Sequence, residues 1–129
     1  MKRIKTMKSA KDYLQVANDV VTRIPGAEAM AKHGTENTVF IDLRDSSDIE
    51  KTGTIAGALR IPRGFIEFAA DENLPIHNEA LKKDKDIYLV CAAGGMAALA
   101  GKTLKDMGFE NVTNIGGISE WIDAGGATE

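Results

Sequence analysis

The sequence predicts an α/β fold with a central parallel sheet of about five strands and helices on both faces. Two observations lead to this prediction. Short apolar runs alternate with segments of helical periodicity along the chain, and the connections between them are short. Residues 87–90 are continuously apolar, which is typical of a central strand that is buried on both faces.

Length and composition limit the function classes. The 129 residues fit one domain with a single core, and the formal net charge of −3 gives no reason to expect a nucleic-acid or membrane partner. No apolar run approaches the roughly 18 residues of a membrane span. The lone cysteine, Cys91, cannot form an internal disulfide, and with two distant histidines it cannot build a structural zinc site. We therefore expect a cytoplasmic protein that needs no metal or cofactor.

The first third of the chain predicts one strand between two helices. A helix is expected at residues 10–19, with Ser9 as its cap. One face of this helix carries apolar residues that we expect to pack: Tyr13, Leu14, Ala17 and Val20. A short strand at residues 20–24 contains a charged residue, Arg23, which favours an edge position. Pro25 suits the start of a helix that extends to about residue 32.

A second strand is expected at residues 38–44, and it becomes polar at its exit. Asp42 and Arg44 are two residues apart and so share one side of the extended chain. We expect them to pair with neighbours and to fix the following loop; a direct catalytic role is the alternative. A short helix is predicted at residues 48–51, with the preceding serines, Ser46 and Ser47, as caps.

The remaining elements complete the alternation. A glycine-punctuated turn at residues 53–58 leads into a short strand at residues 58–61, and a helix follows near residues 65–68. The last strand is expected at residues 112–115 and a final helix at residues 118–124, with Trp121 and Ile122 as its buried anchors. The tail, residues 125–129, is expected to be mobile.

The candidate reactive group is Cys91, at the end of the strand at residues 87–90. Small or flexible residues follow it, and a helical pattern is expected at residues 97–107. The loop N–H groups and the positive end of that helix favour a negatively charged sulfur. Because ligands bind at the carboxyl ends of the strands in such sheets, Arg44, Arg63 and Cys91 could converge on one crevice.

Three markers, in order, resemble those of rhodanese-like domains. The family reads D-x-R then G-H-I-x-G-A, C-R-x-G-x-R-S, and G-F-x-N-V with G-G-x-x-x-W. The similar segments here are residues 41–44 with 53–58 and 61–62, residues 90–98, and residues 108–112 with 116–118 and Trp121. The resemblance covers about residues 20–125, so we divide the chain into an N-terminal helical extension, residues 1–19, and a rhodanese-like domain, residues 20–125.

The resemblance implies a sulfurtransferase. Its cysteine would take sulfur from a small anionic donor such as thiosulfate, carry it as a persulfide, and pass it to cyanide, a thiol or a protein. Cys91 would be the catalytic residue. The backbone of the following loop would bind the anion: Ala92, Ala93, Gly94, Gly95, Met96 and Ala97. Small side chains suit this role because they leave the N–H groups open. Arg63, Arg44 and Asp42 are candidates for an assisting role.

Four positions depart from the family pattern. Met96 replaces the loop arginine, Ala97 the usual serine or threonine, Ala92 an arginine of many members, and Thr54 a histidine. A hydrogen bond to a charged group contributes about 1.5–3 kcal/mol, or one to two decades in rate or affinity. We therefore expect weak use of thiosulfate, with Arg63 as a replacement cation if its loop folds over Cys91. A neutral loop could instead favour a less charged persulfide donor.

Of two alternative functions, one is not expected and one remains open. Related phosphatases have a longer loop with an arginine six positions after the cysteine, where this chain has Ala97, so phosphate-ester hydrolysis is not expected. The second reading is a non-catalytic rhodanese-like binding or regulatory module, in which Cys91 is only a small buried residue. The sequence leaves the donor, the acceptor and the pathway open.

Overall fold

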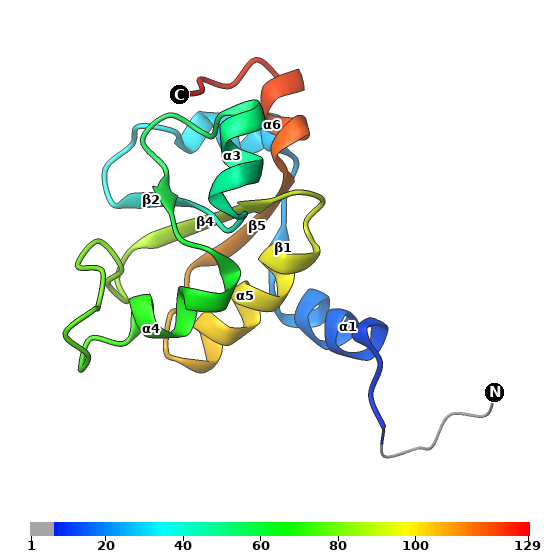
Figure 1. The fold of residues 1–129 in the computed structure, drawn as a ribbon, viewed down its shortest axis with the longest axis vertical. Helices are drawn as coiled ribbons and strands as arrows, with labels where there is room; N and C mark the ends of the chain where they lie inside the picture. Colours follow the sequence, from blue (N-terminus) through cyan, green and yellow to red (C-terminus); the bar gives the residue numbers. More distant parts are fainter. Residues whose placement is uncertain (1–6) are drawn as a thin grey trace.

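The computed structural model describes residues 7–129, and its elements alternate between strands and helices as predicted (Figure 1). Residues 1–6, part of the predicted N-terminal extension, lie outside the described residues. The elements are α1 (Ala10–Val20), β1 (Thr22–Arg23), α2 (Gly26–Ala29), the 3-10 helix η1 (Met30–Lys32), β2 (Thr38–Asp42), α3 (Ser46–Thr52), β3 (Leu59–Arg60), the 3-10 helix η2 (Arg63–Phe65), α4 (Ile66–Ala70), β4 (Asp86–Cys91), α5 (Gly95–Asp106), β5 (Val112–Gly117) and α6 (Ile118–Asp123).

The sheet has five strands in the order β1-β5-β4-β2-β3, and all four neighbouring pairs are parallel. The predicted fold class is confirmed. β4 lies at the centre, and β1 lies at an edge, as its charged residue indicates. The carboxyl ends of β4 and β5 meet at Cys91 and Gly117, which are register partners. This edge of the sheet carries the candidate site.

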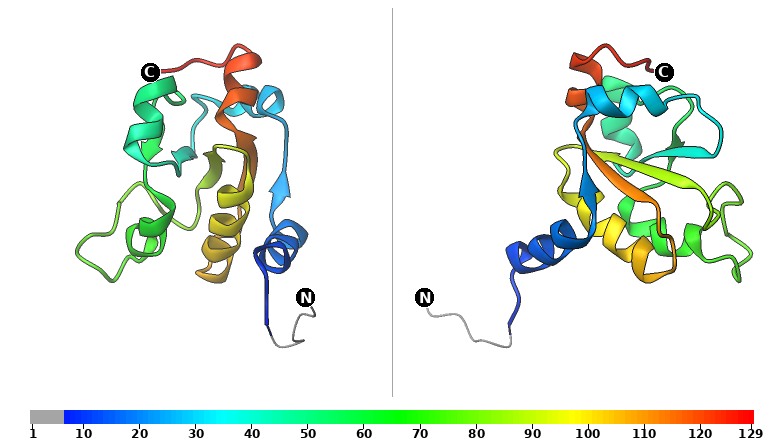
Figure 2. Two further views of the ribbon diagram at one scale, coloured as in Figure 1. Left: turned by 45° about the vertical axis from the view of Figure 1, so that its right-hand side comes forward. Right: turned by 180° about the vertical axis from the view of Figure 1, so that it is seen from behind.

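Side chains of β4 alternate between the two faces, so the core consists of two layers. Ile87, Leu89 and Cys91 belong to the cluster that α4 and α5 cover. Tyr88 and Val90 belong to the opposite cluster, which includes residues of α2 and α6. Figure 2 shows α4 and α5 on one side of the sheet and α2 and α6 on the other. Because of this alternation, the Cys91 side chain lies on the face that packs against α5.

Several element boundaries differ from the predicted ones. α5 begins at Gly95 rather than near residue 97, because its first two residues, Gly95 and Met96, lie outside the buried stripe that produces the periodicity. α3 begins at Ser46 with Asp45 at the N-cap, so the two serines lie inside the helix and cap nothing. β5 continues through two glycines, which carry no strand signal.

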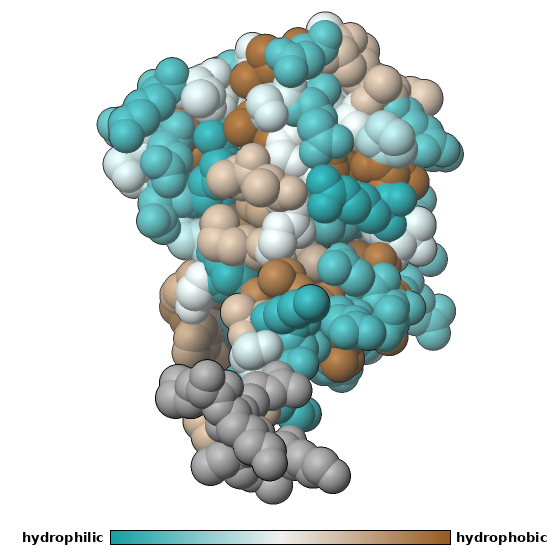
Figure 3. All heavy atoms as spheres, turned by 90° about the vertical axis from the view of Figure 1, so that its right-hand side faces the viewer, coloured by the Kyte–Doolittle hydropathy of each residue, from teal (hydrophilic) through white to brown (hydrophobic). Residues whose placement is uncertain are grey.

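The expected packing face of α1 is only partly correct. Ser9 and Asp12 form a capping box, as the predicted start requires. Ala17 is buried, but Tyr13 and Val20 are 55% and 48% exposed. α1 packs against α5 at the edge of the sheet, so it can bury only a narrow stripe. Figure 3 shows apolar and polar residues interspersed on the side of the molecule that faces right in Figure 1.

Two expectations for the end of the chain are wrong. Ile122 is 38% exposed, whereas its neighbour Trp121 is buried as predicted. The tail is not free of contacts, because Thr128 forms an antiparallel bridge with Ile55. The Thr54 N–H donates to the carbonyl of Glu129, and the Glu129 N–H donates back to Thr54. The edge of the 53–58 turn offered backbone partners that local composition does not reveal.

None of the helices within residues 7–129 is long and apolar enough to cross a membrane. The boundary between an extension and a domain at residues 19 and 20 stays a prediction.

We expect the fold to lose stability in alkali through Tyr88. Burial raises the pKa of its phenol above the ordinary value of 10.0, and the Asp86 carboxylate raises it further. The folded state therefore holds the phenol proton more tightly, and this stabilisation is present below pH 10 and is lost as the pH rises toward the folded-state pKa. Urea unfolding at neutral pH and at about pH 11 should show a smaller alkaline loss for Tyr88→Phe than for wild type. Tyr13→Phe, at an exposed position, should behave like wild type; an equal alkaline loss in all three proteins would contradict the prediction.

Candidate active site

Cys91 is the last residue of the central strand, and its side chain faces α5. The residue is only 1% exposed and packs within the larger apolar cluster. The two residues that follow, Ala92 and Ala93, are exposed, so the loop lies at the surface and the thiol lies beneath it. The sulfur is thus close to the surface and almost entirely covered.

Two backbone N–H groups of the loop point at the sulfur. The Gly94 N–H donates to Cys91 Sγ at 3.0 Å, and the Ala97 N–H donates to the same atom at 3.4 Å. Gly94 has φ +102°, a left-handed conformation that a residue with a Cβ rarely adopts. This conformation curls the loop around the sulfur. Both N–H groups are donors that can stabilise an anion at this position.

The first turn of α5 supplies two further N–H groups. The first four N–H groups of an α-helix have no partner inside the helix. Here the Ala98 N–H donates to the Gly94 carbonyl and the Ala97 N–H donates to the sulfur. Within residues 7–129, the N–H groups of Gly95 and Met96 donate to no protein acceptor. The loop therefore holds two more donors next to the two that contact Sγ.

Residues from β5 support the loop from below, and sequence reasoning missed them. Asn114 is 1% exposed, and its Nδ2 donates to the Gly94 carbonyl at 2.9 Å. A Cβ on Gly117 would overlap the Ala92 carbonyl oxygen, so the loop approaches β5 too closely for any larger residue. The only sequence feature that could have indicated these supports is the close spacing of Asn114, Gly116 and Gly117, which all lie in β5.

Arg23, which the sequence marked only as an edge-strand residue, also reaches the loop. Its Nη2 donates to the Ala93 carbonyl at 3.4 Å and pairs with Glu120 at 3.3 Å. A Cβ on Gly94 would overlap this guanidinium, so the arginine lies directly against the loop backbone. No local pattern links residue 23 to residue 93, since the contact depends on β1 lying beside β5.

Arg63 is placed away from the loop. Its Nη1 pairs with Glu67 at 3.0 Å, and its Nη2 donates to Thr103 Oγ1 at 3.3 Å. Thr103 lies eight residues, or about two turns, beyond Gly95, the first residue of α5. The hydrogen bonds of the guanidinium thus hold it beside the C-terminal half of that helix instead of over Cys91.

Asp42 and Arg44 form a buried ion pair, 0% and 4% exposed, with Nη2 and Oδ2 2.8 Å apart. Arg44 also donates to the Gly53 carbonyl, and Thr54 Oγ1 donates to Asp42. The pair therefore connects the end of β2 to the turn after α3. This agrees with the expectation that the two side chains fix the following loop.

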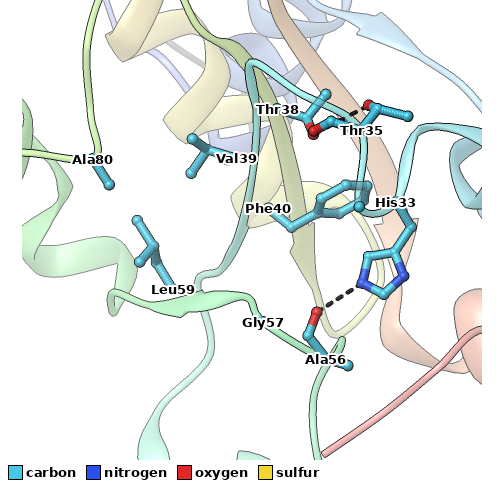
Figure 4. A pocket seen from close by; sticks show the side chains of 10 residues that line it. His33, Thr35, Thr38, Val39, Phe40, Ala56, Gly57, Leu59 and Ala80 are labelled. Atoms are coloured by element: carbon cyan, nitrogen blue, oxygen red, sulfur yellow. Dashed lines mark hydrogen bonds between the residues drawn. The ribbon is translucent and has the colours of Figure 1, made fainter.

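The hollow shown in Figure 4 is not part of this site. Its volume is about 340 Å³, and its wall includes Thr38 and Leu59, the first residues of β2 and β3. Thr38 pairs with Asp86, the first residue of β4, and so lies at the edge of the sheet opposite to Cys91, whereas Leu59 pairs with Ile41. None of residues 91–97 lines the hollow. His33 Nε2 is 2.7 Å from the Ala56 carbonyl there. Among residues 7–129 as a whole, no group of three or more His, Cys, Asp and Glu residues could hold a metal ion.

The fold and the site define a class of protein: an α/β domain with a cysteine in a helix-opening loop after the central parallel strand. A family model for the Rhodanese-like domain matches residues 26–124. The chain therefore belongs to the rhodanese-like domain family, and the resemblance found in the sequence is confirmed.

Named relatives and a solved structure agree with this assignment. The chain is 31% identical over 87 residues to "Putative sulfur carrier protein YrkF" of Bacillus subtilis, an alignment that covers 67% of this chain and 42% of YrkF. It is 30% identical over 92 residues to a sulfurtransferase of Allochromatium vinosum, covering 70% and 78% of the two chains. A structure from Rhodopseudomonas palustris has a TM-score of 0.89 at 36% identity, covering 100% of this chain and 99% of that one. That protein is described as of unknown function and as a possible tyrosine phosphatase.

The chain spans between 29% and 53% of the length of three of its curated relatives.

Proposed function

We propose that the protein is a sulfurtransferase that carries sulfane sulfur as a persulfide on Cys91. The supporting observation is the pair of N–H groups, from Gly94 and Ala97, that converge on Sγ. Membership of the rhodanese-like family and the name of the Allochromatium vinosum relative agree with this function. A lone thiol stays reduced and available in a reducing compartment, so we place the reaction in the cytoplasm.

The proposed reaction has two steps. The Cys91 thiolate attacks the outer sulfur of thiosulfate, the S–S bond of the donor breaks, and sulfite leaves with the bonding electron pair. Cys91 then carries a persulfide anion. In the second step a nucleophile such as cyanide or a thiolate attacks the outer sulfur of the persulfide, and the Cys91 thiolate is released. Atoms and charge balance in both steps, and no cofactor is needed.

The loop backbone suits an anion that changes its position during this reaction. In the attacking thiolate the negative charge is on Sγ, to which two N–H groups donate. In the persulfide the charge moves one bond outward. The N–H groups of Gly95 and Met96, which donate to nothing within the described part of the chain, are the adjacent donors for the outer sulfur. The backbone of residues 92–97 would thus stabilise both anions.

The loop lacks a cation of its own, which bears on the choice of donor. Met96 is 38% exposed in the first turn of α5 and offers no charge. A doubly charged donor such as thiosulfate loses one charge-assisted contact, so we propose slow use of thiosulfate and better use of a less charged persulfide. Asp42, Arg44 and Arg63 assist at most indirectly, because each is engaged with residues outside the loop.

Phosphate-ester hydrolysis is not proposed, although one structural neighbour is described as a possible tyrosine phosphatase. The position six residues after the cysteine holds Ala97. This residue contributes a backbone N–H to Sγ, and its methyl side chain cannot bind a phosphoryl group.

The burial of Cys91 favours a second candidate, a non-catalytic binding or regulatory module. A 1% exposed cysteine within an apolar cluster is also what a merely structural residue looks like. In that case the N–H groups on Sγ would only satisfy the loop backbone.

A donor screen that is read out by mass separates the two candidates. The intact protein is incubated with thiosulfate or with a small-molecule persulfide and is then analysed by mass spectrometry. The sulfurtransferase should gain the mass of one sulfur atom, and cyanide should remove it. Cys91→Ser should gain nothing under the same conditions. If wild type stays unlabelled with every donor, the sulfurtransferase proposal is wrong and the binding module is favoured.

A further inference from the structure

The direction of the Gly94 N–H depends on the two peptide groups that flank Gly94. A peptide group is planar, and its C=O and N–H point in opposite directions. The Ala93–Gly94 peptide directs its N–H at Cys91 Sγ. Whatever binds the Ala93 carbonyl from the other side therefore holds that N–H on the sulfur. The Gly94–Gly95 peptide fixes the other side of the left-handed residue, whose φ is +102°.

Asn114 holds the Gly94–Gly95 peptide. Its Nδ2 donates to the Gly94 carbonyl at 2.9 Å, and its Oδ1 accepts the Gly116 N–H at 2.8 Å. Both polar ends of this 1% exposed side chain are thus used, which fixes the orientation of the amide. The residue connects the end of β5 to the loop at the end of β4.

Arg23 holds the Ala93–Gly94 peptide. Its Nη2 donates to the Ala93 carbonyl, opposite to the N–H that faces the sulfur. Glu120 orients the guanidinium through an ion pair, and the Oε2 atom of that glutamate also accepts the Gly117 N–H. The guanidinium occupies the space that a Cβ on Gly94 would need. Two edges of the same peptide are therefore engaged, one by sulfur and one by arginine.

We propose that Asn114 and Arg23 are positioning residues, which hold the two peptide groups around Gly94 so that its N–H stays on Sγ. This inference extends the proposed function, because a thiolate and then a persulfide are the species that this N–H would stabilise. It makes the site a product of three adjacent strands: β4 carries the cysteine, β5 carries Asn114, and β1 carries Arg23.

The test is the pH dependence of Cys91 alkylation by iodoacetamide. The midpoint of the pH–rate profile reports how well the protein stabilises the thiolate, whereas altered access alone changes the plateau rate. Displacing the Gly94 N–H removes a hydrogen bond to the charged sulfur and should move the midpoint upward by about one pH unit. We expect this shift for Asn114→Leu, which lacks the donor to the Gly94 carbonyl and adds no charge. Asn111→Leu makes the same substitution at an exposed position and should leave the midpoint within about 0.3 pH units.

Arg23→Gln is the second test. We expect this variant to fold, because the Arg23 side chain is 48% exposed. Its hydrogen bond to Ala93 is long and partly exposed, so we expect an upward shift of about half a pH unit. Arg60→Gln removes the same charge from the opposite edge strand, where the residue is exposed, and should leave the midpoint unchanged.

The outcomes separate this inference from the proposed function, since alkylation requires no sulfur donor. If Arg23→Gln and a folded Asn114→Leu both keep the wild-type midpoint, the positioning role is wrong even where sulfur uptake is found. If Arg60→Gln shifts the midpoint as much as Arg23→Gln, the effect is one of net charge and the role of Arg23 is also wrong. A shift confined to Asn114→Leu and Arg23→Gln supports the inference, whether or not wild type accepts sulfur from any donor.

Discussion

Met96→Arg is expected to raise thiosulfate:cyanide sulfurtransferase activity by about 10- to 100-fold. The substitution restores the guanidinium that the family carries at this loop position. A hydrogen bond between charged groups contributes about 1.5–3 kcal/mol, which corresponds to one to two decades in rate. Against this, a cation in the first turn of a helix costs about 0.3–1 kcal/mol. The favourable term is the larger one, and Met96 is 38% exposed, so the longer side chain has room. The measurement is kcat/KM for thiosulfate at fixed cyanide.

Met96→Gln is the matched control, because it introduces a polar side chain without charge and should raise the activity little. The gain of the arginine variant should also shrink at high ionic strength, since it depends on attraction between a cation and an anionic donor. If the arginine variant shows no more activity than wild type, then the loop lacks more than a cation, and the non-catalytic module becomes the better description.

The architecture could be predicted because each part of it has a local cause. The apolar run at residues 87–90 predicts a central strand, and β4 is that strand. Cys91 at the end of this strand, followed by small residues and a helical pattern, predicts a cysteine loop, and the structure contains one. The helix boundaries were less accurate, because first residues that are not buried, such as Gly95 and Met96, contribute nothing to the buried stripe.

The supports of the loop could not be predicted, because they depend on strand order. Arg23 and Ala93 are 70 residues apart and meet only because β1 pairs with β5. Sequence reasoning instead favoured Arg63, which is nearer in sequence and also follows a strand. In the structure Arg63 bonds Glu67 and Thr103 beside the C-terminal half of α5. The position of a residue at a strand exit thus identifies the edge of the sheet, but the direction of a long side chain depends on the packing around it.

Arg44→Met is expected to destabilise the fold by about 3–5 kcal/mol, because it leaves Asp42 charged and buried without its partner. Asp42 is 0% exposed, and the Arg44 guanidinium binds both of its carboxylate oxygens. The remaining partners of the carboxylate, the Arg44 backbone N–H and the Thr54 hydroxyl, are neutral donors. Loss of the guanidinium also removes one of the two donors to the Gly53 carbonyl, the other being the Thr52 hydroxyl. Urea unfolding at neutral pH gives the free energy of unfolding for comparison with wild type.

The double variant Asp42→Asn/Arg44→Met distinguishes a buried unpaired charge from a general loss of packing. It removes both charges, so it should recover a large part of the stability that the single variant loses. Arg63→Met is the exposed-pair control, because Arg63 pairs with a half-exposed Glu67, and such a pair contributes at most about 1 kcal/mol. A loss below about 1 kcal/mol for Arg44→Met would show that the pair does not stabilise the connection between β2 and the turn after α3. With the expected loss, Asp42 and Arg44 are structural residues, and the negative charge on the sulfur depends on the loop backbone.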